Sequence, residues 1–159
     1  MAIYLNYKDI TGEVTAAGHE KWVEVNSFQW GVGRGISTPT GSGADRESSA
    51  PSVSEVVVTK PYDTSSIGFF QELLTPSEAK NATFDFCRTD KDKLTVYLSI
   101  ELQEVMLSGY SLSSGGDRPQ ESISLNFTKV MISETGSDAK GKAGQSTKAG
   151  YDIGAAKPM

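Results

Sequence analysis

Residues 115–130 read GGDRPQESISLNFTKV, and they show most clearly the alternation that a β-protein requires. Two glycines and an aspartate predict a turn, and the proline holds the arginine before it in an extended conformation. From Glu121 onward, apolar side chains at Ile123, Leu125 and Phe127 alternate with polar ones. This pattern predicts an antiparallel strand that is buried on one face.

The alternation slips at Lys129, because Val130 and Ile132 continue the apolar series one residue late. A similar slip occurs in the longest predicted strand, Lys93–Leu107, whose last apolar residues are out of phase with the first ones. Such slips are typical of β-bulges or of strands that are covered on both faces. We therefore expect something to cover the second face of these strands.

Shorter segments with alternating or β-branched composition predict further strands, at residues 3–7, 21–30, 53–59, 81–88 and 151–153. The segment 21–30 carries apolar side chains on both faces, and Trp22, Phe28 and Trp30 are predicted to lie in the core. With one helix added, the fold class is mainly β: a small, compact antiparallel barrel or sandwich of two sheets.

One short helix is predicted after residues 63–66, which offer several N-caps. Ile67, Phe70 and Leu74 follow at helical spacing, joined by Phe69 and Leu73, and Pro76 ends the run. We expect the apolar face of this helix to fill the core of the barrel.

Two segments contain almost nothing that a core could use. Residues 31–52 are rich in Gly, Ser, Thr and Pro, and they are predicted to be an extended loop, either disordered or an arm that becomes ordered on a partner. Residues 136–150 contain mainly Gly, Lys, Ala and Ser, and they are predicted to be a flexible tail of low complexity.

The length of 159 residues predicts a single domain, residues 1–159, that buries roughly 70% of its unfolded surface without disulfides. The net charge of −5 argues against binding nucleic acid or an anionic membrane, and no stretch approaches the length needed for membrane insertion as a spanning helix. The first residues have neither a basic leader nor an apolar run. We expect a soluble cytoplasmic protein, and any export would have to proceed without a cleavable signal peptide.

Residues for catalysis are scarce. His19 is the only histidine and lies in a predicted polar turn, where a solvated surface residue is expected. Cys87 is the only cysteine, and it is expected to be an unreactive thiol on a packed surface. Neither a zinc-ligand cluster nor a nucleophile elbow is present, and the glycine-rich stretches lack the residues that a nucleotide site needs. We expect no enzyme activity, no metal and no cofactor.

Several stretches together resemble the Hcp family, the hemolysin-coregulated tube proteins of bacterial type VI secretion systems. They occur in the family's order and span nearly the whole chain: KWVEVNSFQWGVG, VVVTKPYDTSS, SGGDRPQESISLNFTKV and GYDI. The third stretch is the most specific of the four. Tyr151 stands where many members would carry tryptophan.

The resemblance implies a compact β-barrel of two sheets with one helix at its side, as in phage tail-tube proteins. It implies a homohexameric ring, and rings that stack into a tube beneath a sheath and a VgrG-like spike. It also implies that the tube assembles in the cytoplasm, is itself secreted, and carries small effector proteins in its lumen. A monomeric barrel that binds a small apolar ligand is the alternative, and it predicts a monomer with a ligand-sized cavity.

Site residues follow from the resemblance and from the strand pattern. Gln29 lies on the face opposite Phe28 and Trp30, and we expect it to line the lumen or to face solvent. Arg46 and Glu47, in the extended loop, are the candidates for contacts between rings. Asp117 and Arg118 are candidates for an ion pair that either locks the turn or joins subunits.

Overall fold

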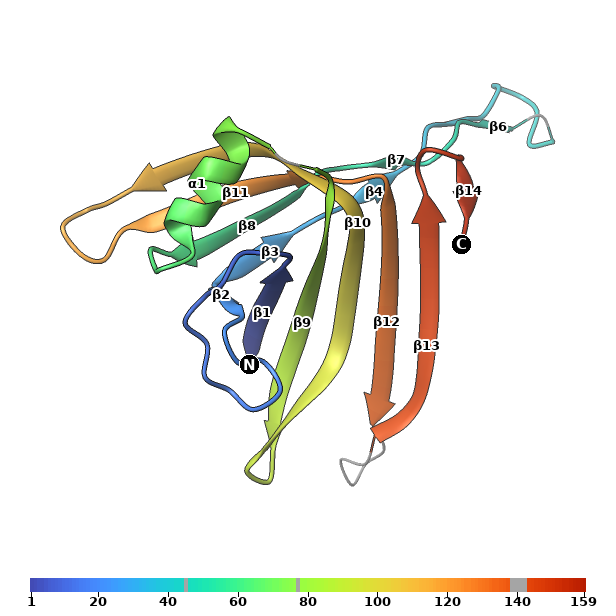
Figure 1. Cartoon of the computed structure of the whole chain (residues 1–159). Coiled ribbons are helices and arrows are strands. Elements are labelled where there is room, and N and C mark those ends of the chain that lie inside the picture. Colours follow the sequence, from blue (N-terminus) through green and yellow to red (C-terminus); the bar gives the residue numbers. More distant parts are fainter. Residues whose placement is uncertain (45, 77, 138–142) are drawn as a thin grey trace.

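The computed structural model describes residues 1–44, 46–76, 78–137 and 143–159. Figure 1 shows a curved antiparallel β-structure with one helix, α1 (Ser66–Leu74), at its side. The strands are β1 (Ala2–Tyr7), β2 (Val23–Val25), β3 (Ser27–Gln29), β4 (Val32–Gly33), β5 (Ile36–Ser37), β6 (Glu47–Ser48), β7 (Ser52–Val53), β8 (Val56–Pro61), β9 (Lys80–Asp90), β10 (Lys93–Ser113), β11 (Gln120–Asn126), β12 (Lys129–Ser137), β13 (Ala143–Asp152) and β14 (Lys157–Pro158). The predicted class, mainly β and antiparallel with one short helix, is confirmed.

Two sheets enclose the core. The first sheet contains β2, β1, β9, the N-terminal part of β10, β12, β13 and β14. The second sheet contains β3, β8, β11 and the C-terminal part of β10. On one side the two sheets are joined by β10, which belongs to both of them. On the other side they are joined by the chain between β2 and β3, so the core is surrounded by the strands and this connection.

The long strand β10 pairs along one edge with both β11 and β12. Met106–Ser113 pairs with β11, whereas Leu98–Gln103 pairs with β12. Residues 127–128 lie between β11 and β12, which is where the sequence predicted a slip in phase. The slip in β10 is also present, because its register against β9 shifts between Leu102 and Val105.

The predicted strand over residues 21–30 is two strands. β2 pairs with β1 in the first sheet, whereas β3 pairs with β8 in the second, and the chain bends at Asn26. The bend changes which side chains face inward: Val23 and Val25 are buried before it, and Phe28 and Trp30 pack on the core after it. Trp22 was predicted to lie in the core, but it is half-buried and packs on the His19 ring.

Of the five apolar residues that the sequence offered on this helix, only Phe69 is fully buried in the core. Phe69 is fully buried and stacks edge-on against Tyr7. Ile67, Phe70 and Leu74 were predicted to face the core, but their exposed fractions are 55%, 46% and 64%. The prediction was wrong because helical spacing identifies an apolar face without identifying what that face contacts.

Both segments of low complexity contain β-structure. Residues 136–137 belong to β12, and residues 143–152 form β13, which pairs with β12, so the predicted flexible tail is wrong for residues 136–137 and 143–150. Residues 138–142 lie outside the described residues. Backbone hydrogen bonds between strands need no apolar side chains, which is why composition misled the prediction.

The segment predicted as an extended loop is a two-stranded ribbon rather than an unstructured chain. β4 pairs with β7 and β5 pairs with β6, and the ribbon projects away from the body in Figure 1. We call residues 32–53 the arm. No helix among the described residues is long and apolar enough to cross a lipid bilayer.

Candidate functional site

The arm is held extended by hydrogen bonds between its outgoing segment, with β4 and β5, and its returning segment, with β6 and β7. The Gly31 amide donates to Ser54 Oγ at 2.9 Å, and the Gly35 amide donates to Ser49 Oγ at 3.0 Å. Along its length the arm exposes Val32 and Ile36, with exposed fractions of 56% and 51%. A ribbon that projects with uncovered apolar side chains has the character of a surface for a partner.

The residues predicted to make contacts between rings lie on this arm. Arg46 and Glu47 are both exposed, and Glu47 pairs with Ser37 in the ladder of β5 and β6. Asp45, which precedes them, lies outside the described residues. Arg46 and Glu47 therefore lie on the part of the chain that projects from the body. Their role in contacts between rings stays a prediction.

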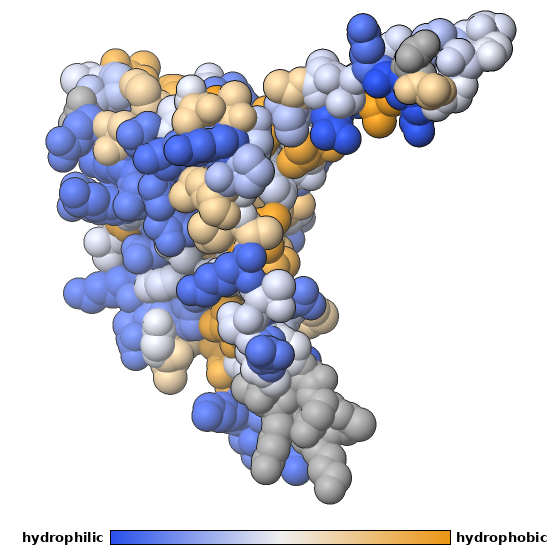
Figure 2. Space-filling view, turned by 90° about the vertical axis from the view of Figure 1, so that its right-hand side faces the viewer, coloured by the Kyte–Doolittle hydropathy of each residue, from blue (hydrophilic) through white to orange (hydrophobic). Residues whose placement is uncertain are grey.

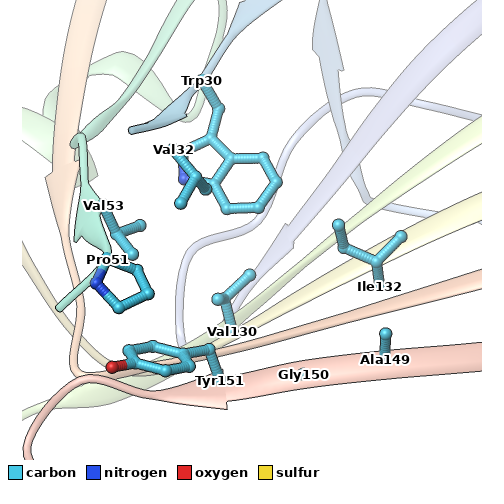
Figure 3. A pocket seen from close by; sticks show the side chains of 9 residues that line it. All are labelled: Trp30, Val32, Pro51, Val53, Val130, Ile132, Ala149, Gly150 and Tyr151. Atoms are coloured by element: carbon cyan, nitrogen blue, oxygen red, sulfur yellow. The ribbon is translucent and has the colours of Figure 1, made fainter. Parts of the chain in front are cut away.

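An apolar pocket lies where the arm joins the body. We call it the arm-base pocket; it has a volume of about 210 Å³. Figure 3 shows that side chains of the arm and side chains of the body both line this pocket. Figure 2 shows hydrophobic side chains gathered in the hollow beneath the arm. It is lined by Trp30, Val32, Pro51, Val53, Val130, Ile132, Ala149, Gly150 and Tyr151.

The outward face of the second sheet consists mainly of small polar side chains. Gln29 is exposed in β3 and points away from the core, because its neighbour Phe28 stacks on Phe84 and Phe86. Directly paired residues share a face of a sheet, so the ladders identify the other members of this face. They are Ser27, Val57, Thr59, Pro61, Met106, Gly109, Ser111, Ser113, Gln120, Ser122, Ser124 and Asn126. We call this surface the serine face.

The turn before β11 is fastened to the same chain. Arg118 Nε donates to the carbonyl oxygen of Tyr62 at 2.8 Å, and its Nη2 lies 3.6 Å from Glu13 Oε2. The carbonyl of Asp117 accepts a hydrogen bond from Ser114 Oγ at 3.2 Å. Within this chain the partner of Arg118 is thus Glu13 rather than Asp117, and an additional role between subunits stays a prediction.

A buried charged network connects α1 to the second sheet. Lys60 and Glu121 are 0% and 1% exposed, and Lys60 Nζ lies 2.7 Å from Glu121 Oε1. Lys60 Nζ also donates to Asp63 Oδ1 at 3.1 Å and to Ser66 Oγ at 3.2 Å. A buried charge is tolerated only when it is paired and hydrogen-bonded, and both charges meet that condition here.

The second oxygen of Glu121 is also satisfied. It accepts a hydrogen bond from the hydroxyl of Tyr110, and Oε1 accepts one from Ser66. Burial, followed by the hydrogen bond to Glu121, raises the pKa of the Tyr110 hydroxyl, so Tyr110 remains a donor at neutral pH. The network therefore holds the start of α1, β8, β10 and β11 in one arrangement.

The sequence analysis missed this network, although the sequence contains a signal for it. Lys60 continues the buried series of Val56 and Val58, and Glu121 precedes Ile123 and Leu125 at the same spacing. A charged residue in phase with a buried apolar series indicates a buried charge, and two such residues on neighbouring strands indicate a pair.

His19 is not the solvated surface residue that was predicted. It is 6% exposed, and its Nε2 lies 2.8 Å from Asp85 Oδ2, whose other oxygen accepts a hydrogen bond from Ser99. The turn folds back over β9, so that the ring contacts Trp22 and Tyr4. The polar residues next to His19 in the sequence could not indicate its burial, because its partner Asp85 is distant in sequence.

Cys87 lies beside this histidine and is fully buried. Burial, followed by the charge of Asp85, raises the pKa of its thiol to about 11. Such a thiol is a poor nucleophile at neutral pH. Among the described residues, no three His, Cys, Asp or Glu side chains form a group that could hold a metal ion.

The comparisons with known proteins assign the family. The family model described as "Type VI secretion system effector, Hcp" matches residues 4–133. The chain belongs to the Hcp family. No curated protein matches it.

Solved structures agree with the Hcp assignment. A structure described as that of a type six secretion system protein has 26% identity and a TM-score of 0.91, with 99% of each chain covered. Hcp1 from Salmonella typhimurium has 22% identity and a TM-score of 0.79, with 99% of this chain and 98% of that one covered. A type VI secretion system effector from Yersinia pestis has 21% identity and a TM-score of 0.75, with 95% and 99% covered.

Proposed function

We propose that this Hcp-family chain is a tube subunit of a type VI secretion system. Six copies form a ring, and rings stack into a tube that a sheath surrounds and a VgrG-like spike caps. The tube assembles in the cytoplasm and is secreted with small effector proteins in its lumen. The observation that carries this proposal is the arm, which presents uncovered apolar side chains away from a body of the Hcp family.

In this proposal the serine face is the wall of the lumen. A channel that carries different proteins needs a wall that is hydrated and that makes few strong contacts with the proteins inside it. Small hydroxyl side chains and the Gln29 amide supply such a surface, since none of the identified residues of this face is charged. The arm, with Arg46 and Glu47, makes the contacts between stacked rings. No catalytic step is assigned to the chain.

The first experiment measures assembly. Light scattering on a sizing column should give a mass near six chains, and electron micrographs of the same peak should show annular particles. A monomer across a wide range of concentrations would contradict the ring and would favour the alternative, a barrel that binds an apolar ligand. The arm-base pocket is smaller than the roughly 300 Å³ at which ligand pockets for drug-sized molecules begin. The two larger pockets, of about 400 and 430 Å³, are lined by residues of α1 with Asp9 and Lys80 and by residues of the arm, so neither is an apolar cavity inside the barrel.

A second experiment tests the lumen. Gln29→Arg adds a charge to the serine face, and Thr89→Arg adds the same charge at an exposed residue near the end of β9. Both variants should form rings as the parent chain does. Only Gln29→Arg should change which effectors co-purify with the rings, and equal effector retention by the two variants would contradict the lumen assignment of Gln29.

A further inference from the structure

The serine face ends beside the arm in a group of different chemistry. Its last paired row joins Met106 of β10 to Asn126 of β11, and both side chains are exposed. Met106 is 48% exposed, and among the residues assigned to the serine face it is the one large apolar side chain with such exposure. The methionine therefore interrupts a surface that otherwise consists mainly of small polar side chains.

Two exposed carboxylates lie on either side of this methionine. Glu55 lies between the arm and β8, and it accepts a hydrogen bond from the hydroxyl of Ser108, two residues after Met106. Because β11 lies between β8 and β10 and its inward face is filled by the core, the Glu55 side chain must cross the outward face. Glu104, two residues before Met106, accepts a hydrogen bond from the hydroxyl of Thr128. We call Glu55, Glu104 and Met106 the acidic rim.

The charges of the acidic rim are not neutralised within the chain. Among the residues that the structure describes, no Lys, Arg or His side chain forms an ion pair with Glu55 or Glu104. Each carboxylate accepts a hydrogen bond from a neutral hydroxyl, which orients the side chain and leaves its negative charge in place. Both carboxylates are therefore available to cations from outside the chain.

In the proposed ring, the acidic rim is repeated in each of the six copies. The serine face lines the lumen in that arrangement, and the rim lies at the end of this face from which the arm projects (Figure 1). A cleft or channel lined by charges of one sign concentrates ligands of the opposite sign. The repeated carboxylates would thus attract basic side chains to one end of a lumen whose wall is otherwise uncharged hydroxyl and amide groups.

Methionine adds an adhesive contact that suits different partners. Its side chain is unbranched, flexible and polarizable, so it adapts to apolar groups of different shapes, and promiscuous binding surfaces use it for this reason. Met106, with Glu55 and Glu104 on either side of it, is complementary to a chain segment that carries an apolar side chain between basic ones.

We propose that the acidic rim binds segments of the carried proteins in which basic side chains flank an apolar one. The basic groups pair with Glu55 and Glu104, and the apolar side chain covers Met106. This inference rests on the proposed function and identifies the chemistry by which the lumen retains its cargo. The rest of the serine face remains a wall to which cargo adheres weakly.

The test measures the binding of labelled peptides to the assembled parent chain. The probe is a short fluorescent peptide of alternating lysine and leucine, and its fluorescence anisotropy is followed at low ionic strength, where exposed charges are least screened. One comparison peptide has glutamate in place of lysine, and another has serine in place of leucine. The lysine–leucine peptide should bind most tightly, and added salt should weaken its binding.

Matched variants assign the binding to the acidic rim. Glu55→Gln and Glu104→Gln each remove one charge but keep an oxygen that accepts the same hydrogen bond, and each should weaken binding of the lysine–leucine peptide by at least about threefold. Asp92→Asn removes one charge from the exposed turn between β9 and β10 and should change the affinity by less than about twofold.

A second pair of variants tests the apolar contact. Met106→Ser should weaken binding of the lysine–leucine peptide by at least about threefold, and it should affect the lysine–serine peptide much less. Leu112→Ser is the control, because Leu112 is an exposed apolar residue on the other face of β10. Met106→Gln, which keeps a similar length, replaces Met106→Ser if the latter does not assemble.

Light scattering on every variant separates a loss of binding from a loss of assembly. Rings that bind the glutamate–leucine peptide as well as the lysine–leucine peptide overturn the acidic rim and leave the proposed function standing. Rim variants that assemble and bind as the control variants do also overturn it. A parent chain that forms no rings overturns the proposed function, and this inference with it.

Discussion

Removing the buried cation Lys60 should destabilise the fold strongly. The carboxylate of Glu121 is 1% exposed, and its Oε1 lies 2.7 Å from Lys60 Nζ. In Lys60→Met this carboxylate loses the only cation that contacts it among the described residues. Asp63 loses the same cation at 3.1 Å. Breaking a buried ion pair by removing one partner costs about 3–5 kcal/mol. For a chain of this size that corresponds to a fall in Tm of about 6–20 °C.

A second substitution should restore part of this loss. Glu121→Gln removes the unpaired charge but keeps a carbonyl oxygen that can accept from Tyr110 or Ser66. The double variant should therefore be more stable than Lys60→Met alone, by at least about 1 kcal/mol.

Urea unfolding followed by tryptophan fluorescence measures these differences. All variants are compared at one protein concentration, because any assembly adds stability that depends on concentration. The reasoning is refuted if Lys60→Met unfolds within about 1 kcal/mol of the parent chain, or if adding Glu121→Gln lowers stability further. Either result would mean that water or a shifted backbone solvates Glu121 when Lys60 is absent.

Three further predictions concern single sites. Gly12→Ala should cost about 1–3 kcal/mol in urea unfolding, because its Cβ would lie 2.3 Å from the Trp22 carbonyl oxygen, whereas Gly115→Ala, which meets nothing within 4 Å, should be neutral. Phe69→Ala should lower the free energy of unfolding by about 3–5 kcal/mol, and Phe70→Ala by much less, because Phe69 is buried and Phe70 is half exposed. Equal losses in the two variants would contradict the packing of α1 described above. The thiol of Cys87, with its pKa near 11, should react with a disulfide reagent at pH 8 at least about 100-fold more slowly in the folded chain than in urea.

The sequence was sufficient to predict the strands that alternate around a buried face. Ile123, Leu125 and Phe127 are buried as predicted, and the slip after them separates β11 from β12. These predictions succeeded because one buried face and one polar face leave a period of two in the sequence. The same signal is absent from residues 143–150, whose side chains are mainly small or polar although their backbone ladders with β12.

The parts of the site that sequence could not predict depend on contacts distant in the chain. The outward position of Phe70 is set by where α1 meets β10, and nothing in the helix itself specifies that meeting. The environment of His19 depends on Asp85, which lies 66 residues away. By contrast, Lys60 and Glu121 were predictable in principle, since both interrupt a buried apolar series with a charge.

The length of β10 has a consequence for how the molecule moves. Its 21 residues ladder with β9, β11 and β12, and Leu98–Leu102 in its middle is paired on both edges. The amide protons of this doubly paired segment should therefore exchange with solvent only when the whole body unfolds. The ladders of the arm contain two residues per strand and should open locally on a much faster timescale. The chain thus combines a body that behaves as one cooperative unit with an arm that can search for a neighbour without loosening that unit.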